Sequence, residues 1–372
     1  MRQMRFTCEK SILSDMINQT GRAVSSKSTI PALEGILIQA EENLTLTGFD
    51  LEVGIRTSSA ASIEEKGSVV INARILSDII RKLPDNIITI SCDERLYVTI
   101  SCGASVFNLI GMDAADYPEL PTVQKERYTT LPQNLLKTII EGTIFSASEN
   151  DSRPIITGCL FKITGDELIV VALDSFRMAL RNETVQRGDS TANMSFVVPA
   201  KALREVNRFL EDSDDNINIS ISRRNIAFEF GDTVLTSRLL EGEFLNYNNA
   251  IPASSSKTLY VNTADLIDSL ERVSLITNDK LRNFVHCTFE DNILKLKCTT
   301  AIGQAYDECY IDPVEGDDLV IGFNSRYLLD ALRACHDEVV KLELNTPTSP
   351  CLIKPKEGNK YLYLILPVRL KA

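Results

Sequence analysis

The sequence predicts an α+β fold of three similar domains, because one succession of helix, strands, helix and strands recurs three times along its 372 residues. A strand that runs into a helix is the clearest repeated unit, at residues 69–83, 196–210 and 320–334. When Arg74, Lys201 and Arg326 are aligned, shifts of 127 and 125 residues bring leucines into register two positions later. The length also fits two or three domains.

A second helix candidate precedes each of these units, at residues 10–24, 131–148 and 262–277. Between the two helices, period-two alternation predicts strand pairs with hairpin turns, at residues 34–50, 157–174 and 285–299. Further strands follow the second helix at residues 87–101, 217–231 and 339–353, with closing strands such as residues 105–111 and 361–368. Each unit therefore reads helix, strands, helix, strands.

Two stretches rich in Pro, Ser or charged residues, 117–128 and 247–257, separate the three units as linkers would. We therefore expect an N-terminal domain at residues 1–126, a central domain at 127–254 and a C-terminal domain at 255–372.

Composition favours an ordinary globular protein, with 44% hydrophobic and 24% charged residues. The nine cysteines lie too far apart for a zinc or redox motif, so we expect buried, reduced thiols, with no metal and no cofactor. The N-terminus lacks the apolar core of a signal peptide, and no aliphatic run is long enough to cross a membrane. The expectation is a cytoplasmic protein without membrane contact.

The net charge of −12 argues against a nucleic-acid partner, but the distribution of charge argues for one. The second helices hold only three acidic residues, and they carry eight basic ones: Arg74, Arg81, Lys82, Lys201, Arg204, Arg208, Arg326 and Arg333. We call these eight the basic helix stripe. Each helix contains a basic pair seven residues apart, which places both side chains on one face. A solvated helix face is the alternative. No base-reading motif is present, so the stripe predicts contact with phosphates regardless of sequence.

Six segments, read together with the threefold repeat, resemble the bacterial sliding clamps, the beta subunits of DNA polymerase III: TIPALEGILI (29–38), LTGFDLEV (46–53), DYPELP (116–121), SRPIITGCLF (152–161), VIGFN (320–324) and LPVRL (366–370). The resemblance covers essentially the whole chain. It implies two helices backed by antiparallel sheets in each domain and a head-to-tail ring of two chains. Six helices packed about 8–10 Å apart would enclose too small a circle for a duplex, whereas twelve leave room.

The resemblance also implies site residues. Lys27, Asn150 and Arg153 would join the basic helix stripe in facing DNA. Arg74, Ile79 and Phe107 would meet the partner subunit at the region of Leu275, Ile276, Asp307 and Glu308. A hydrophobic pocket for peptides would be formed by Ile156, Gly158, Leu173, Asp174, Ser175, Phe176, Arg177, Met178, Leu245, Ala250, Asn324, Tyr327, Leu366, Pro367, Val368, Arg369 and Leu370. Departures from the family pattern at Leu173, Phe176 and Leu245 would make this pocket more apolar.

The function that the resemblance implies is that of a processivity factor with no catalytic site. It would encircle duplex DNA as a homodimer, slide without sequence specificity, and tether DNA polymerase III alpha and other polymerases. Further partners would be the clamp loader and the repair and initiation-regulating proteins that carry clamp-binding peptides. One alternative is a three-repeat peptide-binding scaffold that does not encircle DNA. A second is a hydrolase using Asp50 and Asp174, which is disfavoured because an active site is seldom copied in each repeat and Asp at a strand end is typical of turns.

Overall fold

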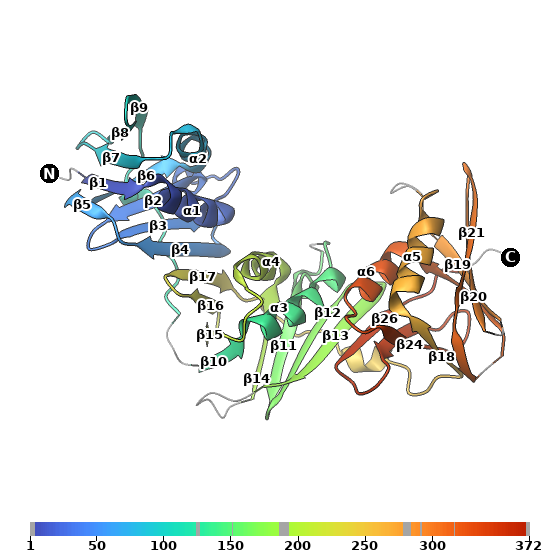
Figure 1. Cartoon of the computed structure of the whole chain (residues 1–372). Helices are drawn as coiled ribbons and strands as arrows, with labels where there is room; N and C mark the ends of the chain where they lie inside the picture. Colours follow the sequence, from blue (N-terminus) through green and yellow to red (C-terminus); the bar gives the residue numbers. More distant parts are fainter. Residues whose placement is uncertain are drawn as a thin grey trace. The chain divides into compact units, whose positions relative to one another are not determined.

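The computed structural model describes residues 4–123, 127–150, 152–185, 193–277, 284–290, 292–315 and 317–369. Helices and antiparallel strands alternate along the chain in the predicted threefold order (Figure 1). Two compact units result, one mainly from Met1–Pro132 and Asp215–Leu239 and the other mainly from Gln133–Arg187 and Leu240–Ala372. Among the residues described, no helix is long and apolar enough to cross a membrane.

The first repeat contains the elements β1 (Met4–Glu9), α1 (Lys10–Thr20), β2 (Gly35–Ala40), β3 (Leu44–Phe49), β4 (Val53–Ser59), β5 (Ser62–Glu65), β6 (Gly67–Asn72), α2 (Ala73–Lys82), β7 (Ile87–Cys92), β8 (Tyr97–Cys102) and β9 (Ser105–Ile110). The two helices contact each other, and a core that includes Phe6, Leu13 and Leu76 fills the space between helices and strands. This arrangement is the predicted one of helices backed by sheets.

The second repeat follows the same order with β10 (Arg127–Pro132), α3 (Gln133–Glu141), β11 (Gly158–Thr164), β12 (Glu167–Leu173), β13 (Arg177–Thr184), β14 (Met194–Pro199), α4 (Ala200–Phe209), β15 (Asn216–Ile221), β16 (Asn225–Phe230) and β17 (Thr233–Arg238). The third has β18 (Lys257–Asn262), α5 (Thr263–Ser274), β19 (Phe284–Glu290), β20 (Ile293–Thr300), β21 (Gly303–Tyr310), β22 (Asp312–Glu315), β23 (Leu319–Asn324), α6 (Ser325–Arg333), β24 (Val339–Leu344), β25 (Cys351–Pro355) and β26 (Tyr361–Ile365). The aligned leucines Leu76, Leu203 and Leu328 are all buried.

The prediction of a strand pair between the two helices of each repeat was incomplete. A third strand follows the pair in every repeat, namely β4, β13 and β21. Two of these strands join successive repeats, since β4 pairs with β17 and β13 pairs with β26, both antiparallel. Each of the two compact units therefore contains one continuous sheet shared by two repeats, of eight strands in the first unit and nine in the second.

Asparagine caps fix where three of the helices begin. The side chain of Asn72 accepts a hydrogen bond from the backbone N–H of Ile75 at the start of α2 (3.2 Å). Asn262 and Asn324 cap α5 and α6 in the same manner. Such caps satisfy backbone donors that the first helical turn leaves unpaired. They set the residue at which α2 and α6, two of the helices that carry basic side chains, begin.

Candidate functional site

The basic helix stripe is exposed along its whole length. All eight of its Arg and Lys side chains lie on the surface of α2, α4 and α6. The opposite faces of these helices bury apolar residues, Leu76 and Ile80 on α2 for example. The predicted spacing of seven residues therefore places each basic pair outward, on the side of its helix away from the core. This arrangement places the cations on the surface, where a polyanion could reach them.

Three acidic residues partly compensate the stripe. Ion pairs join Arg81 to Asp78 (2.6 Å), Arg208 to Glu205 (3.8 Å) and Arg333 to Glu271 on α5 (2.7 Å). All three arginines are well exposed, so these pairs contribute little to stability and give way readily to another anion. Asp330, the third acid of the second helices, is instead held by Arg177.

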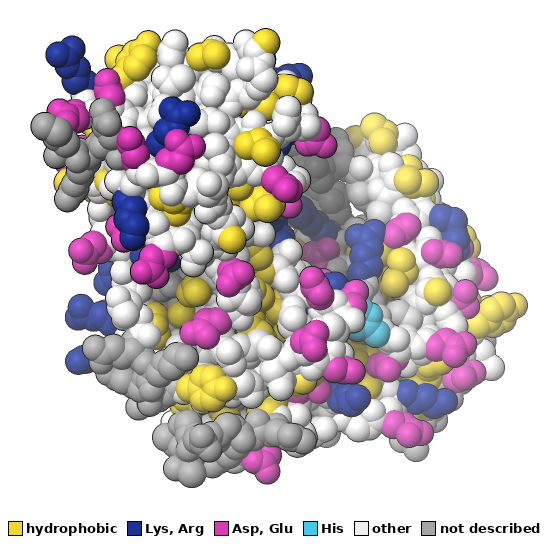
Figure 2. Space-filling model, turned by 60° about the vertical axis from the view of Figure 1, so that its left-hand side comes forward, with side chains coloured by type: hydrophobic (Ala, Val, Ile, Leu, Met, Phe, Trp, Pro, Cys, Tyr) yellow, Lys and Arg dark blue, Asp and Glu magenta, His cyan; other side chains and the backbone are white. Residues whose placement is uncertain are grey.

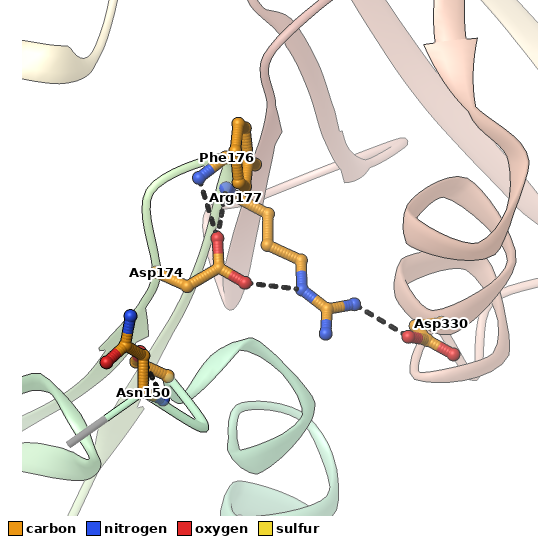
Figure 3. A network of polar contacts seen from close by, with 6 residues as sticks. Asn150, Asp174, Phe176, Arg177 and Asp330 are labelled. Atoms are coloured by element: carbon orange, nitrogen blue, oxygen red, sulfur yellow. Dashed lines mark hydrogen bonds and ion pairs between the residues drawn. The ribbon is translucent and has the colours of Figure 1, made fainter. Parts of the chain in front are cut away.

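Lys27, Asn150 and Arg153 are all exposed, as a role in binding DNA would require. Asn150, labelled in Figure 3, lies in a tight turn. Its backbone N–H donates to Ser148 Oγ (3.1 Å), and its Oδ1 accepts from Ser152 N–H (2.9 Å). The turn thus fixes Asn150 on its loop, and Arg153 follows shortly after on the same loop.

A polar network centred on Arg177 lies in the second unit (Figure 3). Its guanidinium donates from Nε to Asp174 (3.2 Å) and from a terminal nitrogen to Asp330 on α6 (2.6 Å). It also lies 4.4 Å from the ring centroid of Tyr327, in cation–π contact. Arg177 therefore ties the turn after β12 to α6, and holds the rings of Tyr327 and Phe176, stacked at 6.2 Å, beside that turn.

Asp50 and Asp174 both serve as turn residues. Asp174 Oδ1 accepts from the backbone N–H groups of Phe176 (2.7 Å) and Arg177 (2.9 Å), and Asp50 Oδ1 accepts from those of Glu52 (2.9 Å) and Val53 (2.8 Å). Each carboxylate thus closes the loop between two strands. This geometry explains why the residue recurs, and it assigns neither aspartate to catalysis.

The predicted pocket residues divide into a buried base and an exposed rim. Ile156, Leu173 and Met178 belong to one buried cluster, while Phe176, Leu245 and Leu366 expose apolar side chains at the surface. Arg369, Ser175 and Ala250 are exposed, and Pro367 and Val368 are half-buried. Leu370 lies outside the described residues.

Two of the predicted pocket residues have structural roles instead of lining the surface. A Cβ at Gly158 would lie 2.3 Å from the carbonyl oxygen of Val198, so this glycine allows two strands to approach. Asn324 caps α6. The prediction also missed Leu160, Leu364 and Phe244, which join the same cluster. The sequence around these three residues is typical of an ordinary hydrophobic core, and only the fold brings them next to Ile156, Leu173 and Met178.

The residues predicted to contact a second subunit lie at two sheet edges. Phe107 is on the edge strand β9, and Asp307 and Glu308 are on the edge strand β21. A hydrogen bond from Arg272 lowers the pKa of the Asp307 carboxyl, and Glu308 accepts from the Tyr306 hydroxyl. Leu275 is exposed.

Other predicted subunit contacts are less accessible, and further apolar residues at these edges were missed. Ile79 and Ile276 are partly buried against the cores of their own domains, and Arg74 belongs to the basic helix stripe. Ile110 on β9 is 84% exposed and Tyr310 on β21 is 83% exposed. Exposed hydrophobic side chains also occur among charged ones on the face shown in Figure 2.

Comparison with known families accounts for the whole architecture. Three family models of the DNA polymerase III beta subunit match in succession: the N-terminal domain at residues 4–121, the central domain at 130–246 and the C-terminal domain at 248–369. The chain belongs to the beta sliding clamp family. A beta sliding clamp of Staphylococcus epidermidis is 35% identical over 376 residues, which cover 98% of this chain and 99% of the relative.

Solved clamp structures agree over almost the full length. A sliding clamp from Bacillus subtilis has a TM-score of 0.95 at 30% identity, and a DNA polymerase III beta subunit from Eubacterium rectale has 0.93 at 35%. A clamp from Bartonella birtlesii, bound to griselimycin, has 0.93 at 32%. Each match covers 99% of this chain and 100% of the relative.

Membership of the clamp family confirms the predicted fold of three similar α+β domains. It also confirms the predicted function, that of a sliding clamp of DNA polymerase III, which is an accessory subunit and not an enzyme. The comparisons do not favour the scaffold without DNA.

Proposed function

We propose that this clamp chain closes head to tail with a second copy into a ring around duplex DNA, slides along it, and holds polymerases through the pocket beside Arg177. The domains would meet at residues 126/127, of which 126 lies outside the described residues, and at 254/255. The ring would act in the cytoplasm on replicating DNA. The observation that carries the proposal is a pairing between strands of successive repeats. It occurs twice within the chain, and the two strands that would form it a third time, β9 and β21, are left at sheet edges.

The rule is that the third strand of one repeat pairs with the last strand of the next. In the first unit Val53 of β4 lies opposite Ser237 of β17, and in the second unit Arg177 of β13 lies opposite Ile365 of β26. The two pairings have the same register, since Thr57 faces Thr233 as Arg181 faces Tyr361. Both sheets are thereby extended from one repeat into the next by an equivalent antiparallel ladder.

Applied once more, the rule pairs β21 of the third repeat with β9 of another chain. Both are edge strands, and among the described residues β21 pairs with β20 and β9 with β8. The same register would place Gly303 opposite Leu109 and Ala305 opposite Phe107 of the partner subunit. Two chains joined in this way twice form a closed ring, as head-to-tail contacts do when the rotation closes.

The exposure of Phe107 supports this pairing. Its counterparts in the other repeats, Leu235 on β17 and Tyr363 on β26, are both 0% exposed, whereas Phe107 is 37% exposed. The difference is that Leu235 and Tyr363 lie beside a paired strand. A partner β21 would cover Phe107 and the neighbouring Ile110 on the same edge strand.

The basic helix stripe supports contact with the DNA backbone. Replacing Arg74, Lys201 and Arg326 together by Gln removes one stripe cation from each repeat. We expect weaker binding to duplex DNA and a shallower dependence of affinity on salt, by about 0.9 in log–log slope for each phosphate that the variant no longer neutralises. Fluorescence anisotropy over a salt series measures both quantities.

The matched control removes the same charge elsewhere. Lys66, Arg95 and Lys356 are exposed and lie off the stripe, so replacing all three by Gln leaves the slope unchanged. Equal slopes for the two triple variants would contradict a DNA-facing stripe, because net charge alone would then explain the binding.

The exposed apolar rim supports the peptide pocket. An Asp in place of Leu366 puts a charge beside Phe176. The hydrogen bond from the backbone N–H of Leu366 to the Phe176 carbonyl (2.8 Å) involves no side chain, so the variant keeps it. Griselimycin, the ligand of the Bartonella birtlesii clamp, serves as probe. We expect its affinity to fall about tenfold or more in Leu366→Asp, with the dimer intact.

The control for the pocket is Ile87→Asp, which adds the same charge at another exposed apolar residue, on β7. Isothermal titration calorimetry gives the affinity, and light scattering gives the oligomeric state. An unchanged affinity in Leu366→Asp would place the ligand elsewhere, and loss of the dimer in this variant would show that the tail is part of the core.

A further inference from the structure

A groove of about 220 Å³ lies in the first unit, where the first repeat meets the second. Its lining includes the apolar residues Phe49, Leu51 and Pro121 and the exposed arginines Arg224 and Arg238. Complete ligand pockets usually measure about 300–1,000 Å³, so this groove has room for one or two side chains of a longer segment.

The groove occupies the same place in the repeat as the pocket beside Arg177. The turn of Asp50 repeats the turn of Asp174 bond for bond, including the contact that follows it: Arg238 N–H donates to the Glu52 carbonyl (2.9 Å) as Leu366 N–H donates to that of Phe176 (2.8 Å). The repeated fold therefore builds one concave junction twice, each within a single compact unit.

The chemistry of the two junctions differs. Glu52 stands where Phe176 stands in the other junction, and Arg238 stands where Leu366 stands. Two arginines and one glutamate face this groove, so it is net cationic in a chain of net charge −12. An anionic group is therefore the complementary ligand.

Leu51 is the second distinctive feature of the groove. Its side chain is 49% exposed, and its backbone has φ of 76°, a left-handed conformation that is strained for a residue other than Gly, Asn or Asp. Strained backbone concentrates at binding sites, where the surrounding structure holds it in place. Here the strain presents an apolar side chain beside the arginines.

We propose that this groove is a second peptide site, one that takes a short segment with an apolar side chain next to carboxylates. The apolar side chain would pack on Leu51 and Phe49, and the carboxylates would bind Arg224 and Arg238. The analogy with a peptide site rests on the proposed function of the pocket beside Arg177. The groove, its charge and the strained backbone of Leu51 do not depend on that pocket.

The test uses the full-length chain with the first pocket disabled by Leu366→Asp. The probe is a short fluorescein-labelled peptide with a central Leu-Phe pair flanked by Asp residues, and its counterpart flanked by Lys is the control ligand. We expect the Asp-flanked peptide to bind in this background. Further replacement of Arg224 and Arg238 by Glu weakens binding about tenfold or more, measured by anisotropy.

A second variant guards against misfolding. Leu51→Gly relieves the strained φ and removes the apolar side chain, so it weakens the peptide while the melting temperature is kept or raised. The matched control, Lys66→Glu with Arg95→Glu, leaves binding unchanged. The proposal is overturned if the Asp-flanked peptide does not bind, if both flanked peptides bind equally, or if the Arg and Leu51 variants bind as the background does. Failure of the first pocket is seen separately, as griselimycin binding that Leu366→Asp leaves intact.

Discussion

At the scale of single residues, the cysteines show how burial decides chemistry. All nine are free and buried. Burial raises the pKa of Cys159, Cys335 and Cys351 to about 12. A thiol with such a pKa is scarcely ionised near neutral pH, and the thiolate is the reactive form. The predicted interpretation, reduced thiols that fill the core, agrees with these environments.

The raised thiol pKa values predict how stability depends on pH. The unfolded chain loses these protons near its ordinary thiol pKa of about 8.5, whereas the folded protein keeps them until about 12. The thiols' contribution to the free energy of unfolding is therefore complete below about pH 8.5 and is lost as the pH rises toward 12.

Urea denaturation at pH 8 and pH 10 checks this expectation, since the free energy of unfolding should be lower at pH 10. Iodoacetamide labelling followed by mass spectrometry checks the thiol burial on which it depends. The folded protein should resist labelling at about pH 8, and the protein in denaturant should take up label at every cysteine. Rapid labelling of Cys159 or Cys351 in the folded protein would contradict the buried environments described here.

At the scale of elements, the edge strand β9 carries the subunit contact that we propose. Phe107→Asp places a charge where the partner strand would pack, and it should shift the dimer toward monomer at micromolar concentration, raising the dissociation constant by about tenfold or more. Sedimentation velocity measures the change. Ile87→Asp on the interior strand β7 is the matched control and should leave the dimer intact. A Phe107→Asp protein that dimerises like the control would rule out pairing through β9.

The helices were predictable from the sequence because their signals are local. Buried leucines at helical spacing and capping residues such as Asn72 and Asn324 lie within each helix or next to it. The third strands were not predictable, because polar residues point inward and interrupt the period-two pattern. Thr57 on β4 is buried against Thr233, and Arg181 on β13 is buried against Glu183. The contacts that bury Thr57 and Arg181 form only in the assembled sheet, so the local sequence gives no sign of them.

The candidate sites show the same division. The stripe could be found because three helices repeat one exposed basic position, and the exposure of all eight cations agrees with that prediction. The pocket and the subunit edges depended on family resemblance, and the missed residues Leu364, Ile110 and Tyr310 lie in strands whose sequence resembles core. Whether such a residue ends in a core or at an edge is decided by the pairing of strands distant in sequence.

At the scale of the whole molecule, two pairing events would turn six repeats into one ring. The sheets already run from repeat to repeat inside each compact unit, so the subunit contact would repeat a junction that the chain makes twice within itself. A ring would explain how a protein of net charge −12 stays on DNA, because topology and not affinity would retain it. Tethering would then replace dissociation of the polymerase by recapture at high local concentration.

The most direct test of the ring is retention on DNA before and after the DNA is cut. The clamp is loaded on a closed circular plasmid by its loader, and gel filtration separates bound from free protein. We predict that the protein stays with the closed circle and is lost once a restriction enzyme makes ends, because a ring slides off. Equal retention on circular and linear DNA would contradict encirclement and leave binding by affinity in its place.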